Sequence, residues 1–182
     1  MQSLSLYRNA CSWQLDIENS IMYIKNKKGG NNMADTINVG NTILQRAFIE
    51  NVDITPMKLQ KLLYCLYKEY YKRTKRPLFG ERFEAWKYGP VLPSIYAAFK
   101  QYGSNSIKNY ARDASGKIYV VDMNSSIDFW NSFYKVWELY KNLDGIVLSS
   151  YTHRADSAWR KAIDARRPYL LDQDIEEERD FA

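Results

Sequence analysis

The chain has 182 residues, of which 46% are apolar and 15% aromatic, and its formal net charge is +5. This length and composition suit one folded domain with a sizeable core, and they exclude a chain that is disordered throughout. The charge permits contact with nucleic acid or with an acidic protein but selects neither. Cys11 and Cys65 are too few for a disulfide framework or a cysteine metal site.

No stretch of the sequence is long and apolar enough to span a bilayer, and no membrane partner is expected. The first residues lack the basic-then-apolar pattern of a signal peptide. The default expectation is therefore a cytoplasmic protein.

Residues 1–32 differ from the rest of the chain. They show no sustained helical or strand period and end in a polar, glycine-containing run before Met33. Codons for Lys-Gly-Gly can contain a bacterial ribosome-binding sequence, so translation of the natural protein could begin at Met33. Residues 1–32 are then either upstream sequence read in frame or a flexible arm. In both cases we expect the folded domain to occupy residues 33–182.

Two helices are predicted first. Asn38 or Asn41 can cap a helix that ends near residue 51. The next helix has Thr55 as its cap and Pro56 in the first position, where the missing N–H costs nothing. Its apolar stripe, which is expected to be buried, comprises Leu59, Leu62, Leu63, Leu66 and Tyr70. Its other face, which is expected to be solvated, carries Lys58, Lys61, Lys68 and Lys72.

Strand patterns follow. Residues 83–87 alternate with the period of a strand, and Tyr88-Gly89-Pro90 is a strong breaker. Residues 117–121 are rich in β-formers and are expected to pair with 83–87. Further helices are expected from residue 92 to Gly103, after Ser126, over 146–151, over 158–166 and in the acidic tail 172–182. The predicted fold class is mainly α, a compact helical domain with a small two-stranded β element.

Little in the sequence points to catalysis. His153 is the single histidine. No serine is flanked by the glycines of a nucleophile elbow, and Cys65 lies within the predicted helical stripe. The sequence contains no Walker loop or dinucleotide fingerprint. We therefore predict no catalytic, metal-binding or cofactor-binding residues. His153 either bonds backbone or a carboxylate near a helix junction, or contacts a partner. If the protein is an enzyme, His153 is the residue on which its activity would depend.

Several motifs together resemble a known family. They are Met57–Tyr64, Pro77–Phe79, Phe83–Val91, Phe99–Gly103, Thr152-His153 and Trp159. This set resembles the Panacea domain family, the SocA-like antitoxins, which are also described as phage-associated GepA-like proteins. The block Phe83–Val91 is the specific part of the resemblance. Tyr151 and Ala158 depart from the Leu and Pro that the family usually has there.

The resemblance implies an antitoxin of a toxin–antitoxin system, which neutralises a toxin by protein–protein binding and not by catalysis. It implies a cognate toxin as the partner and, from SocA-like members, a protease-adaptor role with the ClpXP protease. No cofactor comes with the family. The alternative function is a nucleic-acid-binding regulatory protein of a phage or mobile element, which the net charge and the lysine face motivate.

The candidate partner-binding residues are Trp86, Tyr88, Gly89, Pro90, His153 and Trp159. The Gly-Pro pair fixes a rigid corner, and a rigid loop loses little entropy on binding. Tyrosine and tryptophan are frequent binding anchors. The alternative is that Trp86 and Tyr88 only pin this corner to the core.

Overall fold

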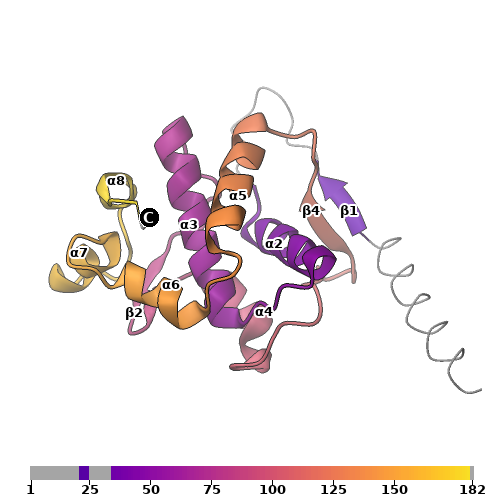
Figure 1. The fold of residues 1–182 in the computed structure, drawn as a ribbon, viewed down its shortest axis with the longest axis horizontal. Helices are drawn as coiled ribbons and strands as arrows, with labels where there is room; N and C mark the ends of the chain where they lie inside the picture. The colour runs from indigo at the N-terminus through magenta and orange to yellow at the C-terminus, as the bar shows by residue number, and fades with distance from the viewer. Residues whose placement is uncertain (1–20, 25–33, 181–182) are drawn as a thin grey trace, which may run out of the picture.

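The computed structural model describes residues 21–24 and 34–180. Within these residues the chain forms seven α-helices and two two-stranded sheets, which confirms the mainly helical fold class. Helix α3 (Pro56–Thr74) lies near the centre of the molecule, between α5 (Ile127–Tyr140) and the helices of the C-terminal part (Figure 1). No helix in the described part of the chain has the length and apolar character needed to cross a membrane.

The remaining elements connect to this centre in a simple order. They are β1 (Ile21–Ile24), α2 (Thr36–Glu50), β2 (Glu84–Trp86), β3 (Gly89–Val91), α4 (Pro93–Phe99), a 3-10 turn η1 (Lys100–Tyr102), β4 (Ile118–Val121), α6 (Gly145–Thr152), α7 (Ala158–Asp164) and α8 (Asp172–Glu177).

The caps of the first two helices follow from local sequence. Thr55 accepts a hydrogen bond from the Lys58 backbone N–H at the start of α3, as predicted. The predicted caps of α2 are wrong, because Asp35 accepts from the first N–H groups instead. Asn41 lies inside α2, where its buried amide bonds the backbone of Ala111 on the loop before β4. A polar side chain can therefore serve a long-range contact that a local cap rule does not foresee.

The leucine stripe of α3 forms the centre of the core, as predicted. Leu59, Leu62, Leu63 and Leu66 are almost completely buried. They belong to one cluster with the buried aromatic side chains of α5, including Phe133 and Trp137, whose rings stack. Burial of this apolar surface is the main stabilising contribution to the fold.

The prediction that the lysine face of α3 is solvated is wrong. Lys61 and Lys68 are only 1% and 4% exposed, and Lys58 is also buried. The Lys58 ammonium donates to the Lys141 backbone oxygen at 2.6 Å, and that of Lys68 donates to the Arg179 backbone oxygen at 3.0 Å. Segments distant in sequence cover this face, so both faces of the helix are buried.

The predicted strand pairing is also wrong. Strand β2 pairs antiparallel with β3, across a turn at Lys87 and Tyr88, and β4 pairs in parallel with β1. The Gly89-Pro90 breaker thus begins a returning strand. Proline is tolerated there because β3 has one side without a partner strand.

Strand β1 lies within residues 1–32, and its Ile21 packs against Ile118 and Val120 of β4. That the domain starts at Met33 stays a prediction. A chain starting at Met33 is expected to unfold cooperatively, because the core around α3 remains. Loss of β1 should lower the thermal midpoint by about 2–8 °C. Loss of the cooperative transition in calorimetry would contradict this domain boundary.

Candidate protein-binding site

The β2–β3 hairpin carries the most specific sequence motif of the chain. Its register places Trp86 opposite Gly89, with Lys87 and Tyr88 in the turn. Gly89 has φ +102°, a backbone conformation that residues with a Cβ rarely adopt. The two turn residues have negative φ, so Gly89 alone supplies the left-handed conformation at this reversal.

Two polar side chains of α3 hold the hairpin from behind. The buried Gln60 amide donates to the Leu92 backbone oxygen at 3.0 Å and accepts from the Leu92 N–H at 2.9 Å. The neighbouring Lys61 ammonium donates to the Pro90 backbone oxygen at 3.1 Å. Both are part of the sequence motif on α3, yet sequence reasoning assigned neither to the site. The helix therefore fixes the returning strand through side-chain contacts with its backbone.

Lys61 is a buried amine with an unusual electrostatic environment. Among the residues that the structure describes, no carboxylate forms an ion pair with it. Burial lowers the pKa of Lys61 to about 8, and the nearby Cys65 opposes this shift only partly. Desolvation disfavours the charged form of an amine, which explains the direction.

The lowered pKa of Lys61 predicts a pH dependence of stability. As pH rises from about 8 towards 10.5, the folded state releases this proton before the unfolded state does, so the free energy of unfolding increases. In Lys61→Met, which keeps the side-chain volume, this contribution is absent. Between pH 7.5 and 9.5 the wild type is expected to gain about 2 kcal/mol more than the variant in urea unfolding.

Lys58 and Lys68 also have lowered pKa values through burial, and they titrate in both proteins. The raised pKa of the buried Tyr64 hydroxyl acts in the opposite direction at higher pH, again in both proteins. The difference in pH dependence between the wild type and Lys61→Met therefore reports the titration of Lys61 alone. An equal gain in the wild type and in Lys61→Met would show that the amine is not held in a desolvated environment.

Helices α6 and α7 support the other side of the hairpin. The Ser149 hydroxyl donates to the Tyr88 backbone oxygen at 3.2 Å, and the Trp159 indole N–H donates to the Trp86 backbone oxygen at 2.8 Å. The His153 ring packs on the Trp159 ring with centroids 4.1 Å apart. Its Nδ1 lies 2.6 Å from the Ser149 backbone oxygen, so Nδ1 carries a proton in this contact.

The six candidate residues thus converge on one place but differ in exposure. Gly89, Pro90 and Trp159 are buried, whereas Tyr88 is 62% exposed and Trp86 is 36% exposed. The buried residues shape and support the hairpin, and the two exposed aromatic side chains are available to a partner. Which of them contact a partner stays a prediction.

Further exposed apolar side chains adjoin this turn, and sequence reasoning did not select them. The Tyr96 ring of α4 contacts the Trp86 ring edge-on at 4.9 Å. Ile146, 75% exposed, lies one turn before Ser149 on the same side of α6. We call this set the hairpin surface; it consists of Trp86, Tyr88, Tyr96 and Ile146.

The chemistry near the hairpin offers no assembled catalytic or metal site. In the described ranges, no three His, Cys, Asp or Glu side chains are grouped so that they could hold a metal ion. Burial raises the pKa of the Cys65 thiol to about 12, so it stays protonated at neutral pH. His153 uses one ring nitrogen for a backbone contact.

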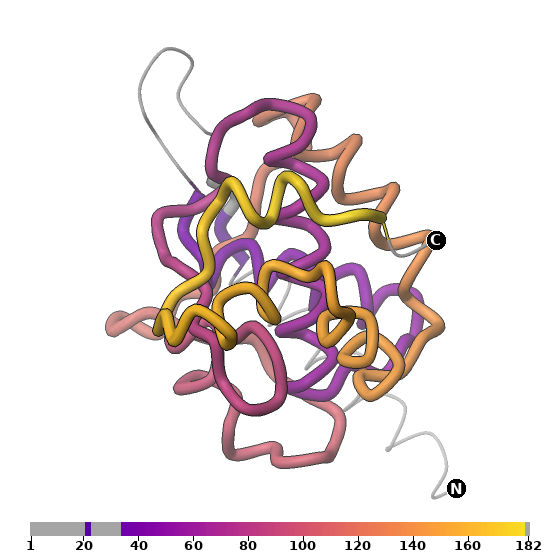
Figure 2. The backbone as a smooth tube through the Cα atoms, turned by 90° about the vertical axis from the view of Figure 1, so that its left-hand side faces the viewer, coloured from indigo at the N-terminus to yellow at the C-terminus, as the bar shows by residue number. Residues whose placement is uncertain are grey.

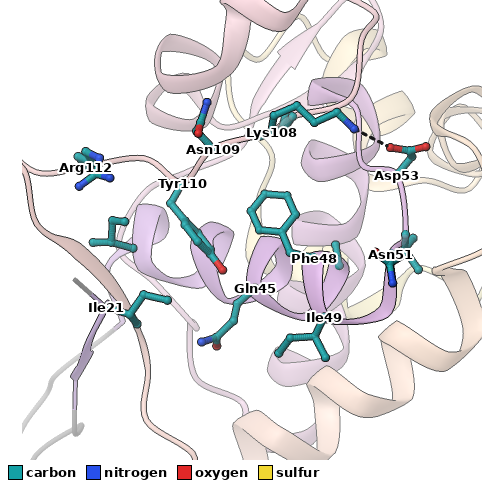
Figure 3. A pocket seen from close by; sticks show the side chains of 14 residues that line it. Ile21, Gln45, Phe48, Ile49, Asn51, Asp53, Lys108, Asn109, Tyr110 and Arg112 are labelled. Atoms are coloured by element: carbon teal, nitrogen blue, oxygen red, sulfur yellow. Dashed lines mark hydrogen bonds and ion pairs between the residues drawn. The ribbon is translucent and has the colours of Figure 1, made fainter. Parts of the chain in front are cut away.

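A cavity of about 410 Å³ lies elsewhere, between α2 and the loop before β4. Figure 3 shows Phe48 and Tyr110 in this pocket and the ion pair between Lys108 and Asp53 at its rim. None of the six candidate residues lines it. The pocket and the motif cluster are therefore separate features.

Comparisons with known proteins agree on one family. Residues 59–160, more than half of the chain, match the family model described as "Antitoxin SocA-like, Panacea domain". Among curated proteins, Antitoxin SocA of Caulobacter vibrioides (strain NA1000 / CB15N) is 40% identical over 73 residues, which are 40% of this chain and 39% of that protein. The aligned part thus spans well under half the length of this relative. No solved structure matches significantly.

Proposed function

Because the chain belongs to the family of SocA-like antitoxins with a Panacea domain, we propose that it neutralises a cognate toxin by direct, non-catalytic binding. The observation that carries this proposal is the convergence of the family's motif residues on one hairpin. That hairpin presents Trp86 and Tyr88 outwards and is held from behind by Gln60, Lys61 and Trp159.

The hairpin surface has the composition of a binding hot spot. Energetically important interface residues are enriched in tryptophan and tyrosine and sit among apolar neighbours that exclude water. Here Trp86, Tyr88 and Tyr96 lie on the side of the hairpin where α6 presents the exposed Ile146. Side-chain contacts fix the backbone of the turn before binding, so little conformational entropy is lost when a partner docks.

The nucleic-acid alternative loses the lysine face, one of the two features that motivated it. Three of the four lysines on the predicted basic face of α3 are buried, and two of them donate to backbone oxygens of covering segments. Phosphate binding requires cations that can reach the polyanion. The geometry therefore favours a protein partner.

Growth rescue tests the proposed function. The gene next to this one is induced in bacterial cells alone and together with the chain. We expect its product to arrest growth and the chain to restore growth. A purified pair that binds without cleavage or modification of the toxin, as seen in its intact mass, supports neutralisation by binding. If the chain rescues no neighbouring toxic gene, the assignment fails.

Tyr88→Ala is expected to weaken toxin binding by about 1 kcal/mol or more, because it truncates an exposed anchor at the tip of the hairpin. The fold should remain intact, since only the backbone oxygen of Tyr88 is hydrogen-bonded to Ser149. Calorimetric titration with the toxin measures the change, and circular dichroism checks the fold.

A matched control for this variant is Ile127→Ala. Ile127 is 74% exposed and begins α5, whose start lies away from the hairpin in Figure 1. Its truncation is expected to leave toxin affinity unchanged. Unfolding of Tyr88→Ala would show that Tyr88 is a structural residue. Equal effects of the two variants on toxin affinity would show that the binding surface lies elsewhere.

A further inference from the structure

The acidic segment Asp172–Asp180 lies on the same side of the molecule as the hairpin and covers the basic side of α3. Six of its nine residues are acidic, and Ile175 is its one apolar residue. Figure 2 shows this segment crossing in front of the central helix. The side chains that receive it form what we call the basic face, which consists of Tyr64, Lys68, Lys72, Lys75, Lys161 and Arg167.

The first half of the segment is held by ion pairs at the surface. Asp174 lies 2.6 Å from the Arg167 guanidinium and 3.5 Å from the Lys161 ammonium. Glu176 forms an ion pair with Lys75. These contacts join the segment to both α3 and α7 through charge.

The second half of the segment reaches a buried anchor. The Tyr64 hydroxyl donates to a Glu178 carboxylate oxygen at 2.5 Å, and the other oxygen lies 3.5 Å from the Lys68 ammonium. Asp180 then pairs with Lys72 at 2.8 Å. A lysine or a tyrosine hydroxyl therefore faces each of these carboxylates, as in a site that recognises an acidic peptide.

The segment is held at its centre by the buried Ile175 and Glu178, whereas its other contacts are ion pairs nearer the surface. Helix α8 has six residues and no side-chain cap at its start. Exposed ion pairs are individually weak and are screened by salt. The preceding residues stay fixed, because Ala85 donates its N–H to the Pro168 oxygen and Leu170 donates to the Phe83 oxygen, each at 2.9 Å. Displacement of the segment is thus confined to the chain after Leu171, and it requires that another carboxylate take the place of Glu178.

We propose that the basic face is a recognition site for an acidic peptide segment, which residues 172–180 fill in the free protein and an acidic segment of the toxin takes in the complex. The chain's own segment shows that an acidic peptide fits the basic face. We assign the occupant to the toxin because the basic face and the proposed toxin-binding hairpin share one supporting helix. Helix α7 carries both Trp159, which bonds the hairpin, and Lys161, which bonds the segment. This inference rests on the proposed function for the identity of its occupant.

A peptide probe tests the site without the toxin. The full chain is prepared with Asp174→Asn, Glu176→Gln, Glu177→Gln and Asp180→Asn, which weakens its own segment while Glu178 and Ile175 remain. The probe is a fluorescent peptide with the sequence of residues 171–180. In the wild type, the tethered segment competes at an effective concentration in the millimolar range. We therefore expect the neutralised chain to bind the peptide at least about tenfold more tightly than the wild type.

Two controls establish that charge directs this binding. The same peptide with its carboxylates replaced by amides should not bind, and adding Lys75→Glu and Lys161→Glu to the neutralised chain should abolish binding. A folded, neutralised chain that binds the acidic peptide no better than the wild type does would overturn the proposal. Equal binding of the amide peptide would overturn it too.

If the neutralised chain does not fold, hydrogen exchange on the wild type tests whether the segment can be released. Between 50 and 500 mM salt, roughly the range over which exposed ion pairs become screened, protection of residues 172–180 is expected to fall while that of α2 and α5 stays constant. Unchanged protection of the segment would contradict its release.

The source of the acidic segment is tested separately. Toxin binding should displace residues 172–180, seen as loss of their exchange protection in the complex. If a neutralised chain mixed with wild type instead forms a dimer in size-exclusion chromatography, the occupant is a second copy and the assignment to the toxin is wrong. Failure of growth rescue with retained peptide binding would overturn the proposed function, whereas rescue without peptide binding would overturn the recognition site.

Discussion

Glu178→Ala is expected to lower the free energy of unfolding by about 3–5 kcal/mol, the range observed when one partner of a buried ion pair is removed. Glu178 is 2% exposed and accepts hydrogen bonds from the Tyr64 hydroxyl at 2.5 Å and from the Ala158 backbone N–H at 2.9 Å. It also lies beside the buried Lys68 ammonium. Truncation leaves these three donors in a dry environment with fewer acceptors.

Urea unfolding at pH 7 measures this effect, and the adjacent Glu177→Ala is the matched control. Glu177 is exposed and pairs with Lys161 at the surface, where solvent screens the ion pair and its removal should change stability little. Similar losses for the two variants would show that Glu178 does not anchor the C-terminal segment. Restoration of stability by adding Lys68→Met to Glu178→Ala would show that the uncompensated lysine causes much of the loss.

Gly89→Ala is expected to cost about 2–5 kcal/mol, because it combines backbone strain with overpacking. Gly89 has φ +102°, and a Cβ built on it would lie 2.6 Å from the Lys61 ammonium nitrogen and 2.9 Å from the Thr152 hydroxyl oxygen. The lysine cannot retreat freely, since it donates to the Pro90 oxygen. The substitution should therefore disturb the hairpin that we propose as the toxin-binding element.

Gly116→Ala separates the two causes. Gly116 also has positive φ, +81°, but a Cβ there would meet no atom within 4 Å. Its replacement should cost only the backbone strain, about 1–2 kcal/mol. Equal costs at the two positions in urea unfolding would contradict the close packing of Gly89 against Lys61.

Local rules predicted the helices well. Thr55 and Pro56 start α3, and Ser126 caps α5, because these signals act within one turn of the chain. The cap of α2 was missed because two asparagines nearby compete with Asp35 for that role. The choice between them depends on Asn41 reaching Ala111 across the fold.

Long-range contacts were beyond the sequence patterns. An apolar stripe shows which face of α3 enters the core, but it does not show that other segments cover the lysines as well. Lys68 lies 111 residues before Arg179, whose backbone oxygen it contacts. Strand pairing failed for the same reason, since β4 pairs with β1, a partner in a region interpreted as an extension.

The candidate site was located by its motif but not explained by it. The block around Trp86 and Gly89 selected the segment that forms the hairpin, because a Gly-Pro pair after an alternating stretch is a local signal. Gln60 and Lys61 were not selected, although the structure places both against the backbone of β3 and Leu92. In the sequence they are ordinary polar residues of a helix, and only their burial shows their role.

The most direct test of direct, non-catalytic neutralisation is a calorimetric titration of the purified full chain with the purified toxin whose growth arrest it relieves. We predict a saturable complex of fixed stoichiometry, an intact toxin mass afterwards, and weaker binding by Tyr88→Ala but not by Ile127→Ala. Relief of toxicity in cells without any heat of binding between the two purified proteins would contradict the account.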